Sequence, residues 1–74
     1  MNKQRRKILG EAIDSISEVQ KLLSSVKDDE QSSYDNLPDS LQYGERGEAL
    51  QNNIEMLDET DNYLDDAISV LEQI

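Results

Sequence analysis

Residues 49–74 read ALQNNIEMLDETDNYLDDAISVLEQI, and their apolar side chains recur every seven residues. Leucine stands at positions 50, 57, 64 and 71, and Ile54, Ala67, Ile68 and Ile74 fall on the same helical face. This period is typical of a helix whose apolar stripe packs against another helix. We therefore predict a helix over about residues 48–74.

A second apolar row accompanies the leucines in this segment. Met56, Tyr63 and Val70 repeat at the same spacing beside the main stripe. One neighbouring helix covers only part of a face this wide, so part of it should meet another chain. We predict an oligomer interface made of Leu50, Ile54, Met56, Leu57, Tyr63, Leu64, Ile68, Val70 and Leu71.

The N-terminal half shows a weaker heptad pattern between Ile8 and Val26. Leu9, Ile16 and Leu23 take one position of the repeat, Ala12, Val19 and Val26 follow three residues later, and Ile8, Ile13 and Leu22 widen the stripe. The pattern predicts a helix over about residues 4–33. Gly10 lies inside it and costs about 1 kcal/mol relative to alanine. It marks either a close helix approach or a weak first turn.

Residues 34–47 interrupt the periodicity and connect the two predicted helices. Pro38 cannot donate a backbone hydrogen bond, and Gly44 and Gly47 loosen the chain. A short turn of helix over residues 39–43 would place the apolar side chains of the connection over the end of the hairpin; these are Tyr34, Leu37, Leu41 and Tyr43. The alternative is an exposed tip that binds a partner.

The chain has 74 residues with neither cysteine nor histidine, which limits how it can be stabilised. Small domains usually depend on disulfides, metals or oligomerisation, and only the last remains open in its common form. We predict one all-α domain over residues 1–74, an antiparallel two-helix hairpin that dimerises into a four-helix bundle.

Catalysis is not expected from this composition. The usual nucleophile and base residues, cysteine and histidine, are absent, and a chain this short has little core to shelter a perturbed carboxylate. Residues 58–62, DETDN, offer oxygen ligands but lack the turn-forming glycine and spaced glutamate of a calcium loop. We predict a non-enzymatic protein without a metal or cofactor.

Charge is divided unevenly along the chain, whose net charge is −10. Residues 28–74 contain fourteen acidic side chains and one basic side chain, Arg46. The outward side of the second helix carries Glu55, Asp58, Glu59, Asp65, Asp66 and Glu72. These carboxylates form either an ordinary solvated face or a surface that matches a basic protein; nucleic acid is not expected to bind here.

Basic residues cluster at the start of the chain, at Lys3, Arg5, Arg6 and Lys7. An antiparallel hairpin would bring them towards the acidic end of the second helix, near Asp65, Asp66 and Glu72. Alternatively, Arg5, Arg6, Lys7 and Arg46 could contact the phosphate of a small nucleotide at a subunit interface.

The segments Leu37-Pro-Asp-Ser-Leu-Gln42 and Glu45-Arg-Gly-Glu48, followed by an acidic heptad helix, resemble small uncharacterised proteins of phages, prophages and mobile elements of Gram-positive bacteria. The resemblance covers residues 34–74. It implies an inhibitor of a host or antiphage-defence protein, with a sponge for a nucleotide second messenger or a structural assembly element as alternatives. Without an apolar run of about 20 residues, we expect a protein of the host cytoplasm with no membrane contact.

Overall fold

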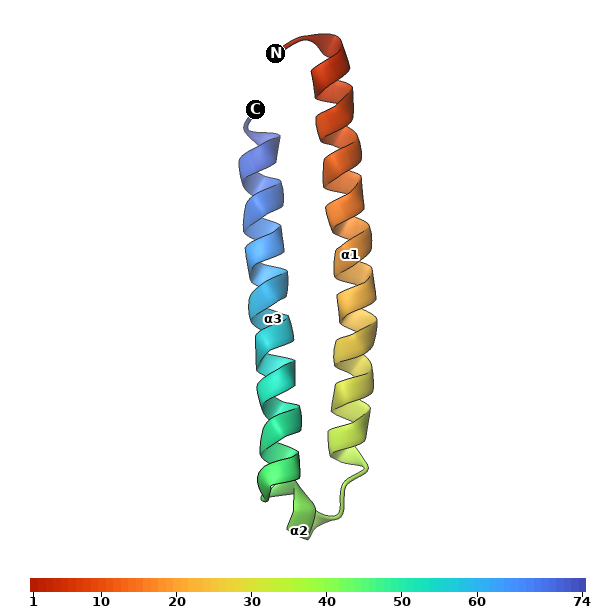
Figure 1. Ribbon diagram of the computed structural model, residues 1–74, viewed down its shortest axis with the longest axis vertical. Helices are drawn as coiled ribbons and strands as arrows, with labels where there is room; N and C mark the ends of the chain where they lie inside the picture. Colours follow the sequence, from red (N-terminus) through yellow and green to blue (C-terminus); the bar gives the residue numbers. More distant parts are fainter.

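The computed structural model describes residues 1–74 as three helices: α1 (Lys3–Asp35), α2 (Asp39–Gln42) and α3 (Glu45–Glu72). The long helices α1 and α3 run antiparallel, with both termini at one end and α2 at the other (Figure 1). There are no strands, so the all-α prediction is confirmed. Neither long helix contains a stretch apolar enough to cross a bilayer.

Local side-chain contacts define where α1 begins and ends. Asn2 Oδ1 accepts a hydrogen bond from the backbone N–H of Arg5 at 2.8 Å, which satisfies one of the free donors of the first turn. At the other end, Gln42 Nε2 donates to the carbonyl oxygen of Tyr34 at 3.1 Å. The last turn of α1 is thereby tied to α2, and the chain reverses within a short connection.

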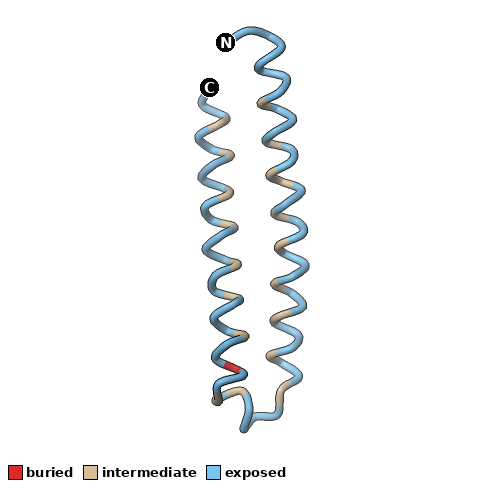
Figure 2. Tube along the Cα trace, in the orientation of Figure 1, coloured by how far each residue is buried: buried red, intermediate tan, exposed pale blue.

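One side of each long helix is half-buried against the other (Figure 2). Positions at alternating steps of three and four residues form the hairpin seam, and all are half-buried except Gly47, which is buried. They are Leu9, Ile13, Ile16, Gln20, Leu23, Lys27, Glu30 and Tyr34 on α1, and Gly47, Leu50, Ile54, Leu57, Asp61, Leu64, Ile68 and Leu71 on α3. The predicted α1 pattern was partly wrong, since Ala12, Val19 and Val26 are exposed. Ile13 takes the place assigned to Ala12 because it completes the alternating steps.

The hairpin has no enclosed core. Gly47 is its only buried residue, and no apolar side chain is buried. The chain exposes 5704 Å² to solvent, whereas a compact monomer of 8.4 kDa exposes about 4600 Å². Its Cα radius of gyration is 17.2 Å, against about 11 Å for a compact domain of this length. A single copy therefore exposes about 1100 Å² more than a compact monomer would.

The connection contains the predicted turn of helix, α2, directly after Pro38. Its apolar residues separate into two groups: Tyr34 and Leu37 are half-buried, whereas Leu41 and Tyr43 are exposed, Tyr43 by 85%. The prediction that all four would pack over the hairpin end was wrong for Leu41 and Tyr43. The four-residue α2 is too short to turn these two side chains onto the long helices.

The structure separates the roles of Gly47, which differs from its prediction, and Gly10, for which it excludes one of two alternatives. Gly47 does not loosen the connection but lies in the first turns of α3, where a Cβ atom would come within 2.0 Å of the carbonyl oxygen of Gln42. Only glycine permits this approach between α2 and α3. Gly10 faces open space, because a methyl group at this position would meet nothing within 4 Å, so it does not mark a close helix approach.

Candidate functional site

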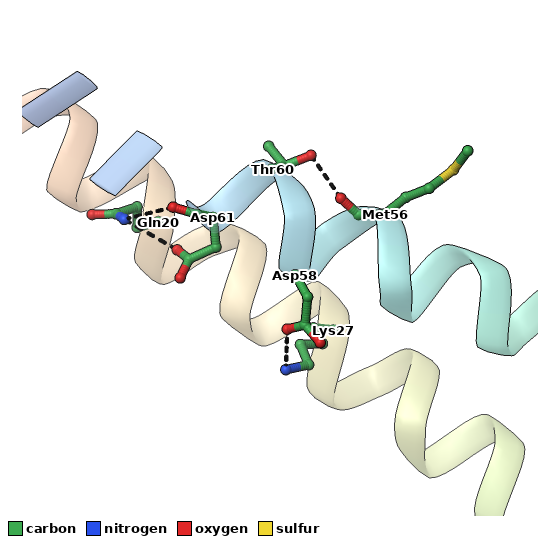
Figure 3. A network of polar contacts seen from close by, with 6 residues as sticks. All are labelled: Gln20, Lys27, Met56, Asp58, Thr60 and Asp61. Carbon is green, nitrogen blue, oxygen red and sulfur yellow. Dashed lines mark hydrogen bonds and ion pairs between the residues drawn. The ribbon is translucent and has the colours of Figure 1, made fainter. Parts of the chain in front are cut away.

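Polar side chains interrupt the hairpin seam at three levels. Gln20 Nε2 donates to Asp61 Oδ1 at 3.1 Å and to Asp65 Oδ1 at 2.7 Å. Further along, Lys27 forms an ion pair with Asp58 (Figure 3). Nearer the connection, Asn53 Nδ2 donates to Glu30 Oε2 at 3.0 Å. A helix pair that slid by one heptad would break these contacts, so they specify the register of α1 against α3.

Asp58 raises the pKa of Lys27 above its ordinary value of 10.5, first through their hydrogen bond and then through charge attraction that Asp28 and Asp61 reinforce. The raised pKa means that the contact stabilises the hairpin fully below about pH 10.5 and is lost as pH rises through the folded-state pKa.

We expect the melting temperature of the Lys27→Arg variant to fall less than that of the native chain as pH rises from about 9 to about 12, the range in which lysine side chains titrate. The guanidinium stays protonated throughout this range, whereas the native ammonium does not. Thermal unfolding of both proteins across this range checks the prediction. If the melting temperatures of both proteins fell equally as pH rises, the contact between Lys27 and Asp58 would contribute nothing to stability.

A row of uncharged residues runs along part of each long helix, one residue before the seam positions from Leu9 to Lys27 on α1 and from Leu50 to Leu71 on α3. We call the two rows together the uncharged face: Ile8, Ala12, Ser15, Val19, Leu22 and Val26 on α1, and Ala49, Asn53, Met56, Thr60, Tyr63, Ala67, Val70 and Ile74 on α3. The rows lie on the same side of the hairpin, because Val26 and Met56 line one surface hollow. Leu22, Tyr63, Met56 and Val70 are 60–68% exposed. In Figure 3, Met56 points away from α1.

The opposite side of the hairpin is polar. Ser24 and Asp58 line one hollow there, and Gln31, Gln51 and Glu55 line another. We call this side, with the outward edge of α3, the acidic face; it carries the six predicted carboxylates, all of them exposed: Glu55, Asp58, Glu59, Asp65, Asp66 and Glu72. The hairpin therefore has two long sides of different chemistry, one that is uncharged over residues 8–26 and 49–74 and one that is rich in carboxylates.

Internal contacts use half of these carboxylates. Asp58 pairs with Lys27, Asp65 accepts from Gln20, and Glu59 accepts from the hydroxyl of Tyr63 at 3.1 Å. The other three, Glu55, Asp66 and Glu72, take part in no ion pair and no side-chain hydrogen bond. These three are free to meet a cationic partner.

The residues predicted for an oligomer interface divide into two rows. Six of them are half-buried in the hairpin seam against α1, namely Leu50, Ile54, Leu57, Leu64, Ile68 and Leu71. Met56, Tyr63 and Val70 lie on the uncharged face and are exposed. Only this second row remains available to another chain without separating the two helices.

The basic residues do not converge on one site. Arg5, Arg6 and Lys7 are at the start of α1, whereas Arg46 is at the start of α3, beside the connection. The hairpin is 59 Å long, so a single copy cannot bring both groups to one phosphate. The antiparallel arrangement brings the basic start towards the end of α3 as predicted, but no ion pair joins them, because the ion pairs of the chain are Lys21–Glu18 and Lys27–Asp58. Arg6 and Glu72 share only the lining of a hollow at the open end of the hairpin.

Four surface hollows occur along the hairpin, and no side chain that lines them is buried. No three potential metal ligands among histidine, cysteine, aspartate and glutamate come together. Chemically, the surface offers contact areas for other molecules instead of a sheltered pocket for a small ligand.

Comparison of the sequence with protein-family models, with curated proteins and with solved structures finds no match.

Sequence reasoning missed the α1 half of the uncharged face and the polar contacts in the seam. The signal was present, because steps of three and four residues from Leu9 to Tyr34 pass through Gln20, Lys27 and Glu30. A search restricted to apolar residues skips these positions and assigns Val19 and Val26 to the wrong stripe.

Proposed function

We propose that this protein is a non-enzymatic interaction protein of phage type, which pairs into a four-helix bundle and inhibits a host or antiphage-defence protein through its acidic face. The observation that carries the proposal is the combination of an uncharged long side with an opposite side rich in carboxylates. A bundle assembled through the first would present the second to solvent.

Pairing is supported by the surface that one copy leaves exposed. One copy exposes about 1100 Å² more surface to solvent than a compact monomer of its mass would. This extra area is comparable to the roughly 800 Å² that each partner buries in a stable protein interface. Two-helix hairpins with no buried side chain have little hydrophobic stabilisation of their own. Association of two copies would supply the missing burial.

A basic partner is supported by the free carboxylates of α3. After Arg46 the chain contains eight acidic residues and no basic one. Like charges three or four residues apart destabilise a helix by a few tenths of a kcal/mol per pair. Opposite charge on a partner would relieve this repulsion and accelerate association. The resemblance to small phage proteins supports inhibition as the consequence of binding.

We expect neutralisation of Glu55, Asp66 and Glu72 to abolish partner capture. The triple variant Glu55→Gln, Asp66→Asn, Glu72→Gln is compared with the native chain by affinity capture from host lysate, followed by mass spectrometry and an activity assay of the captured protein. The native chain should retain a protein with a basic surface, inhibit it, and release it as salt rises above about 0.15 M.

The matched control is Glu11→Gln, Glu18→Gln, Asp29→Asn, which removes the same charge from exposed positions of α1 outside the acidic face; the Glu18–Lys21 ion pair that it breaks is exposed. It should capture the partner as the native chain does. Equal capture by both triple variants, or no inhibition of the captured protein, would contradict the proposed role of the acidic face.

A further inference from the structure

We infer that the uncharged face is the docking surface for a second copy of this chain, and that the two acidic faces consequently lie on opposite outer sides of the dimer. The inference rests on the proposed pairing and deepens it by assigning the face, the occupant and the number of partner sites.

The angle between the seam and the uncharged row on each helix fits a dimer packed through the uncharged face. Each residue of an α-helix is rotated by about 100° from the one before it, so the uncharged row stands about 100° from the seam. In a square four-helix bundle each helix meets two neighbours at roughly a right angle. On both α1 and α3 the seam packs against the other long helix of the same chain. The uncharged row, turned by about 100°, would face a helix of the second copy.

The distribution of charge selects a second copy as the occupant. A chain with a net charge of −10 repels its own copies, and the uncharged face is the long side where two copies can meet without opposing carboxylates. From Ile8 to Val26 on α1, and from Ala49 to Ile74 on α3, no charged residue interrupts the rows. A basic partner would gain nothing from this side.

Size and polar groups also suit a buried interface between copies. The uncharged face runs for about 27 Å along α1 (residues 8–26) and about 38 Å along α3 (residues 49–74) at about 1.5 Å per residue, which is long enough for two helices of a second hairpin to pack along it. Two hydroxyl groups on the face already have partners: Thr60 Oγ1 donates to the carbonyl oxygen of Met56 at 2.8 Å, and the Tyr63 hydroxyl donates to Glu59. They can lose water at low cost.

This arrangement predicts a bivalent dimer. The acidic face lies across the hairpin from the uncharged face, so stacking two hairpins through the uncharged sides leaves one acidic face on each outer side. The carboxylates of the two copies do not merge into one denser surface. The dimer would bind two basic partners, one per side.

Adjacent lysine substitutions test the assignment. We expect Tyr63→Lys and Val70→Lys to lower the molar mass from dimer to monomer and to reduce helix content at about 10 µM, since each buries an unpaired charge in the proposed interface. Asn62→Lys and Ser69→Lys, one residue earlier and outside the uncharged face, should leave both quantities unchanged. Sedimentation equilibrium and circular dichroism measure them.

Thiol protection gives a second readout that does not depend on the lysine variants folding. The chain has no cysteine, so Met56→Cys and Asn62→Cys each introduce a single reactive group. The thiol at 56 should be labelled at least tenfold more slowly than the thiol at 62 when the protein is dimeric. If the thiols at 56 and 62 were labelled at equal rates in a dimeric protein, or if Asn62→Lys or Ser69→Lys dissociated the dimer, the interface would lie elsewhere and the inference would be overturned. A monomeric native chain would instead refute the pairing itself.

Discussion

Gly47→Ala is expected to lower the stability of the folded protein by about 2 kcal/mol, even though alanine is the better helix former. Two effects oppose each other. Helix preference favours alanine by about 1 kcal/mol. Against it stands a steric conflict with backbone atoms: the new Cβ would lie 2.0 Å from the oxygen and 2.6 Å from the carbonyl carbon of Gln42. A backbone cannot rotate away as a side chain can, so the conflict costs about 3 kcal/mol and dominates.

Relief requires α2 to move away from α3, which would also remove the hydrogen bond from Gln42 to Tyr34 at the end of α1. Thermal or chemical unfolding measures the loss. Gly10→Ala is the matched control, because it makes the same exchange at an open helical position and should stabilise the protein by about 1 kcal/mol. If both variants were stabilised alike, the close approach at Gly47 would be refuted.

The double variant Gln20→Leu, Asp61→Leu should be more stable than the native chain, by about 2 kcal/mol or roughly 10 °C in melting temperature. Both residues occupy seam positions between layers of leucine and isoleucine. Leucines there would bury apolar surface in place of a hydrogen-bonded polar pair, an exchange that often stabilises helix bundles.

The same double variant should lose structural specificity. The contact of Gln20 with Asp61 and Asp65 links defined levels of the two helices, and an all-apolar seam tolerates sliding by a heptad. Sedimentation velocity should show mixed species where the native chain shows one. Gln20→Leu alone, which leaves Asp61 without its donor, should show little of the stability gain. A double variant that melts below the native chain would mean that the polar contact is a net source of stability.

Periodicity was sufficient to predict the two long helices, because apolar residues at heptad spacing have few alternative packings. The leucines at 50, 57, 64 and 71 all lie in the seam as half-buried residues. The short helix α2 was also predictable, since Pro38 stands immediately before it.

Two features could not be predicted from apolar periodicity. Gly47 was assigned to the connection because glycine is common in loops, and only the approach of the Gln42 backbone explains its place in α3. The basic start of the chain lies towards the end of α3 but forms no ion pair with it, because exposed ion pairs are weak and do not determine geometry. Asp65, one of the expected partners, accepts from Gln20 instead.

The candidate site was predictable only in part. Its carboxylates were identified from their one-sided placement on α3, and Met56, Tyr63 and Val70 from their spacing. The contribution of α1 was hidden, because Val19, Leu22 and Val26 were merged with the seam. To distinguish the uncharged row of α1 from its seam, one must know which α1 residues face α3. The seam includes the polar residues Gln20 and Lys27, so apolar spacing alone does not reveal it.

The most direct test of this account is the molar mass of the native chain in solution, measured by sedimentation equilibrium from about 1 to about 100 µM at about 0.15 M salt. We predict a folded dimer, with twice the 8.4 kDa of one chain and helix content that falls as the dimer dissociates. A helical, cooperatively melting monomer of 8.4 kDa across the whole range would contradict it.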